Sequence, residues 1–352
     1  MTASKKNQYE DLIDQMMIEE VSGLDQEIAA TLRGLSTNKK RMAILSILDK
    51  DRDMFLKIRD AVKNNNVSKT EHIKNVVEMM RSYVKVGEVE KKEFGEVMTP
   101  ISLVNEMLDT LPKEIWSDHN KKWLDPCSGV GIFSCIIVER LMEGLKYFQT
   151  DEELRYKYII ENMIYVGELQ PKNMFLFLCA FDPNDEYSLN VYTGSFLDEN
   201  FDNHMKDVWE IEKFDIVVQN PPYNDANENK GSAHVLWDKF ILKTLEKILK
   251  VKGYLVAVHP DGWRSLGGGF YNIKTILSGK KMTYLEVHDR TDGVKTFGVQ
   301  TAYDFYCLIN EDNSSKHKTR IKFLDGTEEI INISELDFIP NGMYETFKNL
   351  IA

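Results

Sequence analysis

Long apolar runs are missing from this chain of 352 residues. The densest apolar patch, residues 174–181, spans about two helical turns, whereas a membrane-crossing helix needs ~20 residues. The first ten residues lack the apolar block of a secretory signal, and the four cysteines form no Cys-x-x-Cys pair. We therefore expect a protein of the reducing cytoplasm that does not contact a membrane.

An excess of basic charge is missing as well, with 44 Lys and Arg against 56 Asp and Glu. The division is uneven, because residues 33–92 carry 15 basic and 8 acidic residues whereas residues 93–233 carry 11 and 26. Phosphate contacts need only local basic patches, so the balance excludes a uniformly basic surface and leaves nucleic acid open as a partner. Lys239, Lys243 and Lys247 form one helical stripe, which is either a solvated face or a set of phosphate contacts.

The apolar pattern divides the chain into three parts. Residues 1–92 contain no proline and carry apolar residues at helical spacing, which predicts a helical N-terminal region with a helix start at Ser68. An α/β domain is expected at residues 93–310 and a short C-terminal extension at residues 311–352. Seven β-rich runs alternate with helical stretches, which predicts a doubly wound sheet. The expected strands are residues 123–124, 163–166, 189–192, 214–219, 254–259, 283–288 and 302–309.

A glycine-bearing turn, LDPCSGVGIF at residues 124–133, follows the first expected strand. Gly129 and Gly131 let the backbone approach a ligand at the carboxyl edge of the sheet. The turn is neither G-x-G-x-x-G nor a phosphate loop, since no Gly-Lys-Ser/Thr follows, and Asp125 suits a cationic group better than a phosphate. Glu168 ends the next strand, where an acid can accept both hydroxyls of a ribose. An ordinary strand-to-helix turn and a solvated glutamate are the alternatives.

The run QNPPY at residues 219–223 is the most specific in the chain. Pro221 and Pro222 fix their φ angles and remove two backbone donors, so nearby carbonyls stay rigidly aimed. Asn220 adds an amide oxygen, and Tyr223 adds a flat aromatic face. Such a site can hold a planar amine, pull it toward tetrahedral geometry and stabilise the positive charge that grows as the nitrogen attacks a methyl group. A plain turn after a buried strand is the alternative.

Together these motifs resemble those of the S-adenosylmethionine-dependent amino methyltransferases, and most closely the N6-adenine DNA methyltransferases of restriction-modification systems. The resemblance covers residues 93–310, with cofactor motifs before the catalytic one, as in the gamma class. It implies a Rossmann-like fold with a mostly parallel seven-stranded sheet, S-adenosylmethionine as cofactor and DNA as substrate. The run FGEVMTP at residues 94–100 is similar to the segment that closes over the methionine end of the cofactor.

The resemblance also implies roles for individual residues. The target base would be flipped out of the duplex and stacked between Tyr223 and Phe297. The implied catalytic residues are Asn220, Pro221, Pro222 and Tyr223. The implied cofactor-binding residues are Thr99, Pro100, Asp125, Pro126, Gly129, Gly131, Glu168 and Phe196. No metal is implied, because none of the seven histidines has a metal-ligand spacing.

The chain departs from the family pattern at two places. Ser195 stands where the family usually has an acid, just before Phe196, which would pack on the cofactor adenine. Relatives usually continue with a large target-recognition region after the last strand, whereas residues 310–352 follow here. A separate specificity or nuclease subunit therefore stays open as a partner.

Two other functions stay open. The Asn-Pro-Pro-Tyr string also occurs in methyltransferases that act on ribosomal RNA or on glutamine amides of release factors, and a glutamine amide fits the same two acceptors. A non-catalytic methyltransferase-like subunit, docked through residues 1–92, is the third possibility.

Overall fold

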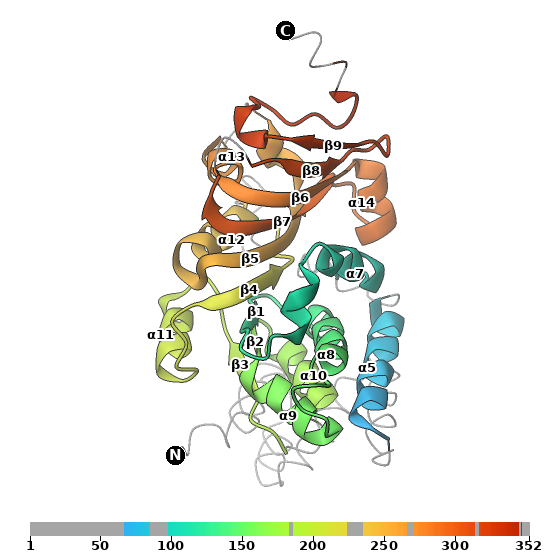
Figure 1. Ribbon diagram of the computed structural model, residues 1–352, viewed down its shortest axis with the longest axis vertical. Helices are drawn as coiled ribbons and strands as arrows, with labels where there is room; N and C mark the ends of the chain where they lie inside the picture. The colour runs from blue at the N-terminus through green and yellow to red at the C-terminus, as the bar shows by residue number, and fades with distance from the viewer. Residues whose placement is uncertain are drawn as a thin grey trace, which may run out of the picture.

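The computed structural model describes residues 67–84, 98–182, 186–223, 235–265, 271–313, 317–344 and 346. Within these ranges, strands form one sheet in the order β3-β2-β1-β4-β5-β7-β6-β8-β9 (Figure 1). Neighbours in the stretch β3-β2-β1-β4-β5 pair in parallel, and β7 runs antiparallel to both β5 and β6. The strands are β1 (Trp123–Asp125), β2 (Ile164–Glu168), β3 (Asn190–Thr193), β4 (Phe214–Gln219), β5 (Leu249–Pro260), β6 (Lys280–His288), β7 (Tyr303–Asp312), β8 (Thr319–Lys322) and β9 (Glu328–Ile331).

The predicted doubly wound, mostly parallel sheet is confirmed, and each of the seven expected strands is present. Strand β4 has the predicted bounds because its run is apolar on both faces. Ile216 and Val218 belong to one hydrophobic core, whereas Val217 belongs to the other. Such a strand is covered by helices on both sides of the sheet.

The sheet continues beyond residue 310, where we expected only a short extension. Strands β8 and β9 form an antiparallel hairpin, and β8 pairs in parallel with β6. The hairpin turns at Asp325 and Gly326, where Gly326 has a φ of 79° and the Asp325 carboxylate accepts from the Thr327 N–H at 3.0 Å. An Asp-Gly pair between two strand-like runs is a hairpin signal, so this turn was readable in the sequence.

Helices cover both faces of the sheet and make a three-layer fold (Figure 1). One face carries α7 (Ile101–Asp109), α8 (Ile132–Gly144), α9 (Glu152–Asn162), α10 (Pro171–Phe181) and α14 (Arg290–Phe297). The other face carries α11 (Glu199–Asp207), α12 (Trp237–Lys243) and α13 (Tyr271–Ser278). Short helical turns connect them: η2 (Lys113–Ser117), η3 (Thr244–Ile248), η4 (Asp261–Arg264) and η5 (Ile333–Glu335).

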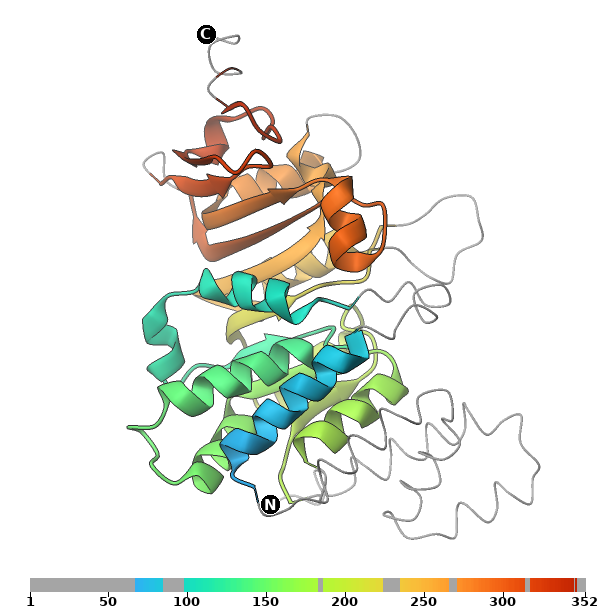
Figure 2. The same cartoon turned by 90° about the vertical axis from the view of Figure 1, so that its right-hand side faces the viewer.

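Helix α5 (Lys69–Val84) lies across the outside of α8 and α9 (Figure 2). Its expected start is confirmed, because the Ser68 hydroxyl accepts from the Glu71 N–H at 3.2 Å as an N-cap. Ile73 and Val76 are almost fully buried in the core that the sheet shares with α8. Residues 1–66, where further helices are expected, lie outside the described residues, and the boundaries at residues 92 and 310 stay predictions.

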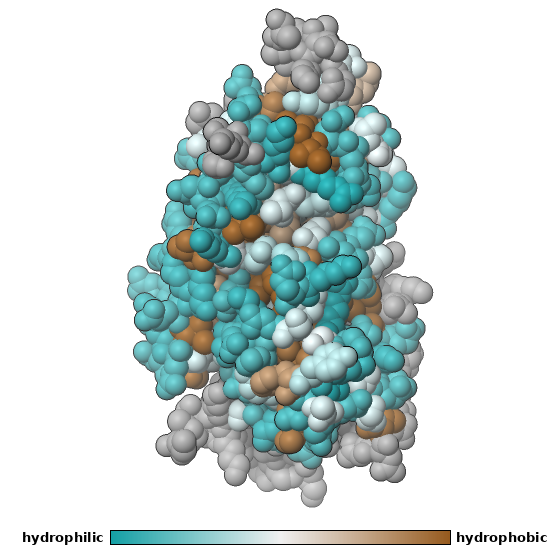
Figure 3. All heavy atoms as spheres, viewed as in Figure 1, coloured by the Kyte–Doolittle hydropathy of each residue, from teal (hydrophilic) through white to brown (hydrophobic). Residues whose placement is uncertain are grey.

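The surface drawn in Figure 3 is mainly hydrophilic, with small and separate hydrophobic areas. Among the helices that the structure describes, none is both long and apolar enough to cross a membrane.

Candidate functional site

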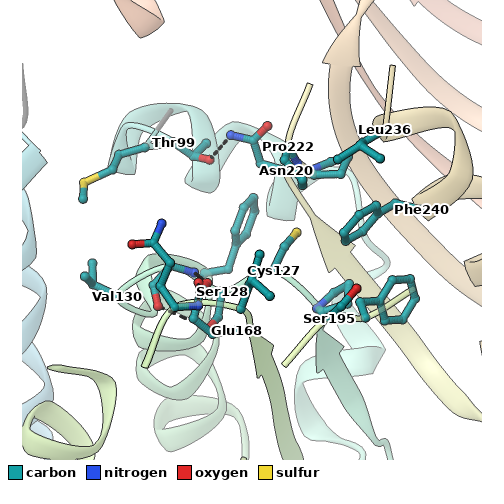
Figure 4. Close-up of a pocket in the computed structure, with 18 of the residues that line it drawn as sticks. Thr99, Cys127, Ser128, Val130, Glu168, Ser195, Asn220, Pro222, Leu236 and Phe240 are labelled. Atoms are coloured by element: carbon teal, nitrogen blue, oxygen red, sulfur yellow. Dashed lines mark hydrogen bonds between the residues drawn. The ribbon is translucent and has the colours of Figure 1, made fainter. Parts of the chain in front are cut away.

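A cavity opens at the carboxyl edge of the sheet, where β1, β2 and β4 end (Figure 4). Parallel strands present their carboxyl ends on one edge, so segments that are far apart in the sequence meet there. Most of the predicted site residues line this cavity: Thr99, Pro126, Gly129, Glu168, Phe196, Asn220, Pro221, Pro222 and Tyr223. Residues 94–97 of the run that precedes Thr99 lie outside the described part of the chain.

Four predicted residues do not line the cavity. Pro100 is the N-cap of α7, and Gly131 is the N-cap of α8. Asp125 lies behind the lining, buried at the end of β1. Phe297 is 1% exposed in the core, edge-to-face with Tyr303 at 4.9 Å between ring centroids. Its ring therefore offers no free face for stacking on a base in this conformation.

The loop after β1 is held by a carboxylate of the neighbouring strand. Both oxygens of Glu168 accept backbone N–H groups, from Gly129 at 2.8 Å and from Gln170 at 2.7 Å. Gly129 and Gly131 have φ angles of 53° and 96°, which are left-handed values. A Cβ on Gly131 would lie 2.5 Å from the Phe177 ring, so glycine is required there both by φ and by space.

Asp125 is a second buried acid beside Glu168. Its Oδ1 accepts from the Cys127 N–H at 3.3 Å, and its buried Oδ2 has no hydrogen-bond partner within the described ranges. Burial raises the pKa of Asp125 to about 8, backbone donation from Cys127 opposes the rise, and the nearby Glu168 adds to it. Burial also raises the pKa of Glu168, against the pull of its backbone donors. A cation would favour the ionised form of both acids.

Asn220 lies at the opposite rim of the cavity from Glu168 (Figure 4). Its Nδ2 donates to the Thr99 hydroxyl at 2.9 Å, a contact between residues that are 121 positions apart. The backbone N–H of Asn220 donates to the Cys127 thiol, which opposes a rise of the thiol pKa caused mainly by burial. Thr99 is 5% exposed. The corner at residues 220–223 is thus in direct contact with the loop after β1 and with the segment before α7.

Tyr223 is the last residue of the corner at residues 220–223. Its backbone oxygen accepts from the Leu236 N–H at 3.2 Å, just before α12 begins. The hydroxyl oxygen is buried with no hydrogen-bond partner in the part of the chain that the structure describes, and burial raises its pKa. Leu236 lines the cavity and was not predicted, because a lone leucine at a helix start carries no sequence signal.

Aromatic rings form another wall. Phe196 packs on Phe240 at 5.1 Å between centroids, and both residues line the cavity. The Lys243 amino group lies 5.1 Å from the Phe196 ring centroid and pairs with Asp202 at 2.6 Å. Lys243 is therefore paired within the fold. Of the two interpretations of the lysine stripe at residues 239, 243 and 247, phosphate contact gains no support from Lys243. Phe240 was not among the predicted site residues.

The sheet order, the glycine turn after β1, the acid that ends β2 and the cavity at the carboxyl edge define the fold of S-adenosylmethionine-dependent methyltransferases. Residues 78–247 match the family model described as N-6 DNA Methylase. The resemblance predicted from the motifs is confirmed.

Individual proteins are also similar to this chain. An uncharacterized adenine-specific methylase of Mycoplasma pneumoniae is 25% identical in an alignment that covers 67% of this chain and 76% of the relative. A DrdV–DNA complex has the same fold, with a TM-score of 0.56 and 13% identity over 97% of this chain and 47% of that one. A modification subunit of a putative type I restriction enzyme from Vibrio vulnificus gives a TM-score of 0.47 and 16% identity over 78% of this chain. The chain spans 58% of that subunit's length.

Proposed function

We propose that the chain transfers a methyl group from S-adenosylmethionine to the N6 amine of adenine in DNA. The observation that carries the proposal is the meeting of two motifs at one cavity, with the Asn220 corner facing the loop anchored by Glu168. The match of residues 78–247 to the N-6 DNA Methylase model and the description of the Mycoplasma pneumoniae relative as adenine-specific support this substrate.

The residues around the cavity fit the cofactor. Phe196 offers a wall for the adenine, the Glu168 carboxylate lines the cavity where ribose hydroxyls can donate to it, and Asp125 supplies negative charge for the cationic end. Gly129 lets the backbone approach closely. When bound, the cofactor supplies a methyl group already activated as a sulfonium, so the protein needs no strong general base.

The Asn220 corner acts on the target amine. An adenine amine is weakly nucleophilic because its lone pair is delocalised into the ring. The Asn220 Oδ1 and the Pro221 carbonyl accept hydrogen bonds from its two N–H groups. These hydrogen bonds localise the lone pair on the nitrogen and stabilise the positive charge that develops there. Two consecutive prolines keep these acceptors in place before the base arrives.

Tyr223 provides the aromatic face for the base. Extrusion of a base from a duplex costs a few kcal/mol, and stacking on an aromatic ring returns about 1 to 3 kcal/mol. The proposed partner Phe297 can contribute only if its ring leaves the core on substrate binding, because it is 1% exposed in the present conformation.

We also propose that sequence recognition is supplied by a separate specificity subunit. The described residues after 310 are built into the sheet as β8 and β9, with η5 packed beside them. DNA from cells that express this chain alone should therefore carry no fully modified short motif when it is sequenced for modified adenines. Modification of one motif at every occurrence would contradict this part of the proposal.

Transfer of a labelled methyl group to DNA tests the function. Replacement of Asn220 by alanine removes one of two acceptors and should lower the transfer rate by about 10² to 10³. Asn120→Ala is the matched control, since Asn120 is exposed and bonded only locally to Asp118 among the contacts described. Unchanged transfer by Asn220→Ala would disprove the mechanism. Label found in RNA or protein but never in DNA would show that DNA is not the substrate.

A further inference from the structure

The Asn220 side chain has a contact outside its own motif. The Nδ2 group donates to the Thr99 hydroxyl at 2.9 Å, and both residues line the cavity (Figure 4). Thr99 belongs to the segment just before α7, where the Pro100 carbonyl accepts from the Val104 N–H at 3.0 Å. The threonine is thus fixed by the start of a helix and is 5% exposed.

An asparagine amide has a donor end and an acceptor end. A half-turn about its last side-chain bond exchanges them with little change in shape. A target amine brings N–H donors, so only the orientation that presents Oδ1 can hold it. In the reversed orientation two NH₂ groups would face each other, and the amine would lose an acceptor.

The rest of the corner is already rigid. Pro221 and Pro222 fix the backbone that follows Asn220, and the Cys127 thiol accepts the backbone N–H of Asn220. Neither of these features fixes the turn of the amide itself. The Thr99 hydroxyl is the group that the structure places on the donor end of that amide.

We propose that Thr99 is a positioning residue for methyl transfer, whose hydroxyl holds the Asn220 amide with Oδ1 presented to the target amine. The proposal rests on the proposed function, in which Asn220 accepts from that amine. It gives Thr99 a role distinct from cofactor binding, and it couples the segment before α7 to the chemistry at the end of β4.

Removal and return of the hydroxyl test this role. Thr99→Val keeps the shape, removes the acceptor, and should lower kcat about tenfold with the KM for the cofactor unchanged. Thr99→Ser should restore kcat to within about twofold. Thr110→Val is the matched control, because the Thr110 hydroxyl bonds to the Met107 carbonyl at the other end of α7. A loss of cofactor affinity equal to the loss of kcat would overturn the proposal.

A second background isolates orientation from all other effects. In Asn220→Asp both side-chain oxygens are acceptors, so a half-turn changes nothing. Thr99→Val should therefore reduce kcat less than about twofold in that background. An equal loss in both backgrounds would show that Thr99 does not act through the orientation of Asn220.

A measurement without turnover completes the test. With ¹⁵N-asparagine labelling, the side-chain amide signals of Asn220 are assigned by their loss in Asn220→Ala. They should shift, and their protons should exchange about tenfold faster with solvent, in Thr99→Val but not in Thr110→Val. Unchanged signals in Thr99→Val would overturn the proposal. If the wild-type protein transfers no methyl group at all, the proposed function fails, and these signals alone decide the contact.

Discussion

Two aspartates are buried at the same edge of the sheet, yet their surroundings differ. Asp125 ends β1 behind the cavity, and Asp304 lies at the start of β7, opposite His259 of β5. Each has one buried oxygen without a hydrogen-bond partner among the described residues, and burial raises both pKa values, to about 8 for Asp125 and about 7 for Asp304. An unsatisfied oxygen therefore does not by itself distinguish a functional acid from a structural one.

The difference lies in the cation. Asp304 Oδ2 accepts from the Arg264 Nε at 2.7 Å and from the Trp263 Nε1 at 2.9 Å. The Arg264 guanidinium also bonds to the Ile339 carbonyl, which ties the end of the described chain to this edge. Asp125 has an acid, Glu168, as its charged neighbour instead. A buried acid with its own cation serves the fold, whereas one that lacks a cation is suited to a cationic ligand.

The largest effect should come from breaking the internal pair. Asp304→Ala removes the fully buried carboxylate from the Arg264 Nε and leaves the guanidinium with the more exposed Asp261 at 3.1 Å. This loss should lower the free energy of unfolding by about 3 to 5 kcal/mol in urea denaturation. Asp312→Ala, at an exposed pair with Lys280, should change it by less than about 1 kcal/mol. A small loss for Asp304→Ala, or a loss of cofactor affinity as large as that caused by a change at Asp125, would break the comparison.

The second effect concerns the acid without a cation. Asp125→Asn should leave the ligand-free protein folded and weaken S-adenosylmethionine binding about 100-fold at pH 8, by calorimetry, because the variant lacks the negative charge. Asp118→Asn, at a partly exposed acid that does not line the cavity, is the control. Wild-type affinity in Asp125→Asn would remove Asp125 from the cofactor site.

The third effect sharpens the same contrast through pH. Since the pKa of Asp125 is raised to about 8 in the ligand-free protein, the acid must lose its proton when a cation binds. Cofactor affinity should therefore rise by up to about tenfold per pH unit as the pH approaches 8, and level off above it. The affinity of Asp125→Asn should not follow this rise, and a wild-type affinity that is constant between pH 6 and 8 would contradict the assignment.

The smallest effect is on stability without ligand. The pKa values of Asp125 and Asp304 are both higher in the folded protein than the usual value near 4, so the folded state binds more protons than the unfolded state between pH 4 and 8. The free energy of unfolding should fall as pH rises through this window. Asp125→Asn should make the fall shallower, most visibly between pH 7 and 8, and an unaltered slope would argue against the raised pKa of Asp125.

The sequence predicted the parts of the site that are local. The turn after β1 and the QNPPY corner are continuous runs, and parallel strand order brings their ends to one edge. The contact of Asn220 with Thr99 could not be predicted, because it joins residues 121 positions apart through the placement of α7.

Burial was harder to predict than secondary structure. The resemblance implies a stacking role for Phe297 but not the direction of its ring, and in the structure that ring enters the core beside Tyr303. The two extra strands were missed although Asp325 and Gly326 gave a hairpin signal, since their runs are short and charged, as in the exposed Glu328 of β9. Long-range packing decides both outcomes.

The most direct test of the central claim is the identity of the methylated base. After incubation of DNA with the protein and S-adenosylmethionine, together with a specificity subunit if one is required, nucleosides are separated and weighed by mass spectrometry. If Asn220 and Pro221 accept from an adenine amine, the product is N6-methyladenine. This product should be lost in Asn220→Ala. A different methylated base, or N6-methyladenine formed equally by Asn220→Ala, would contradict the account.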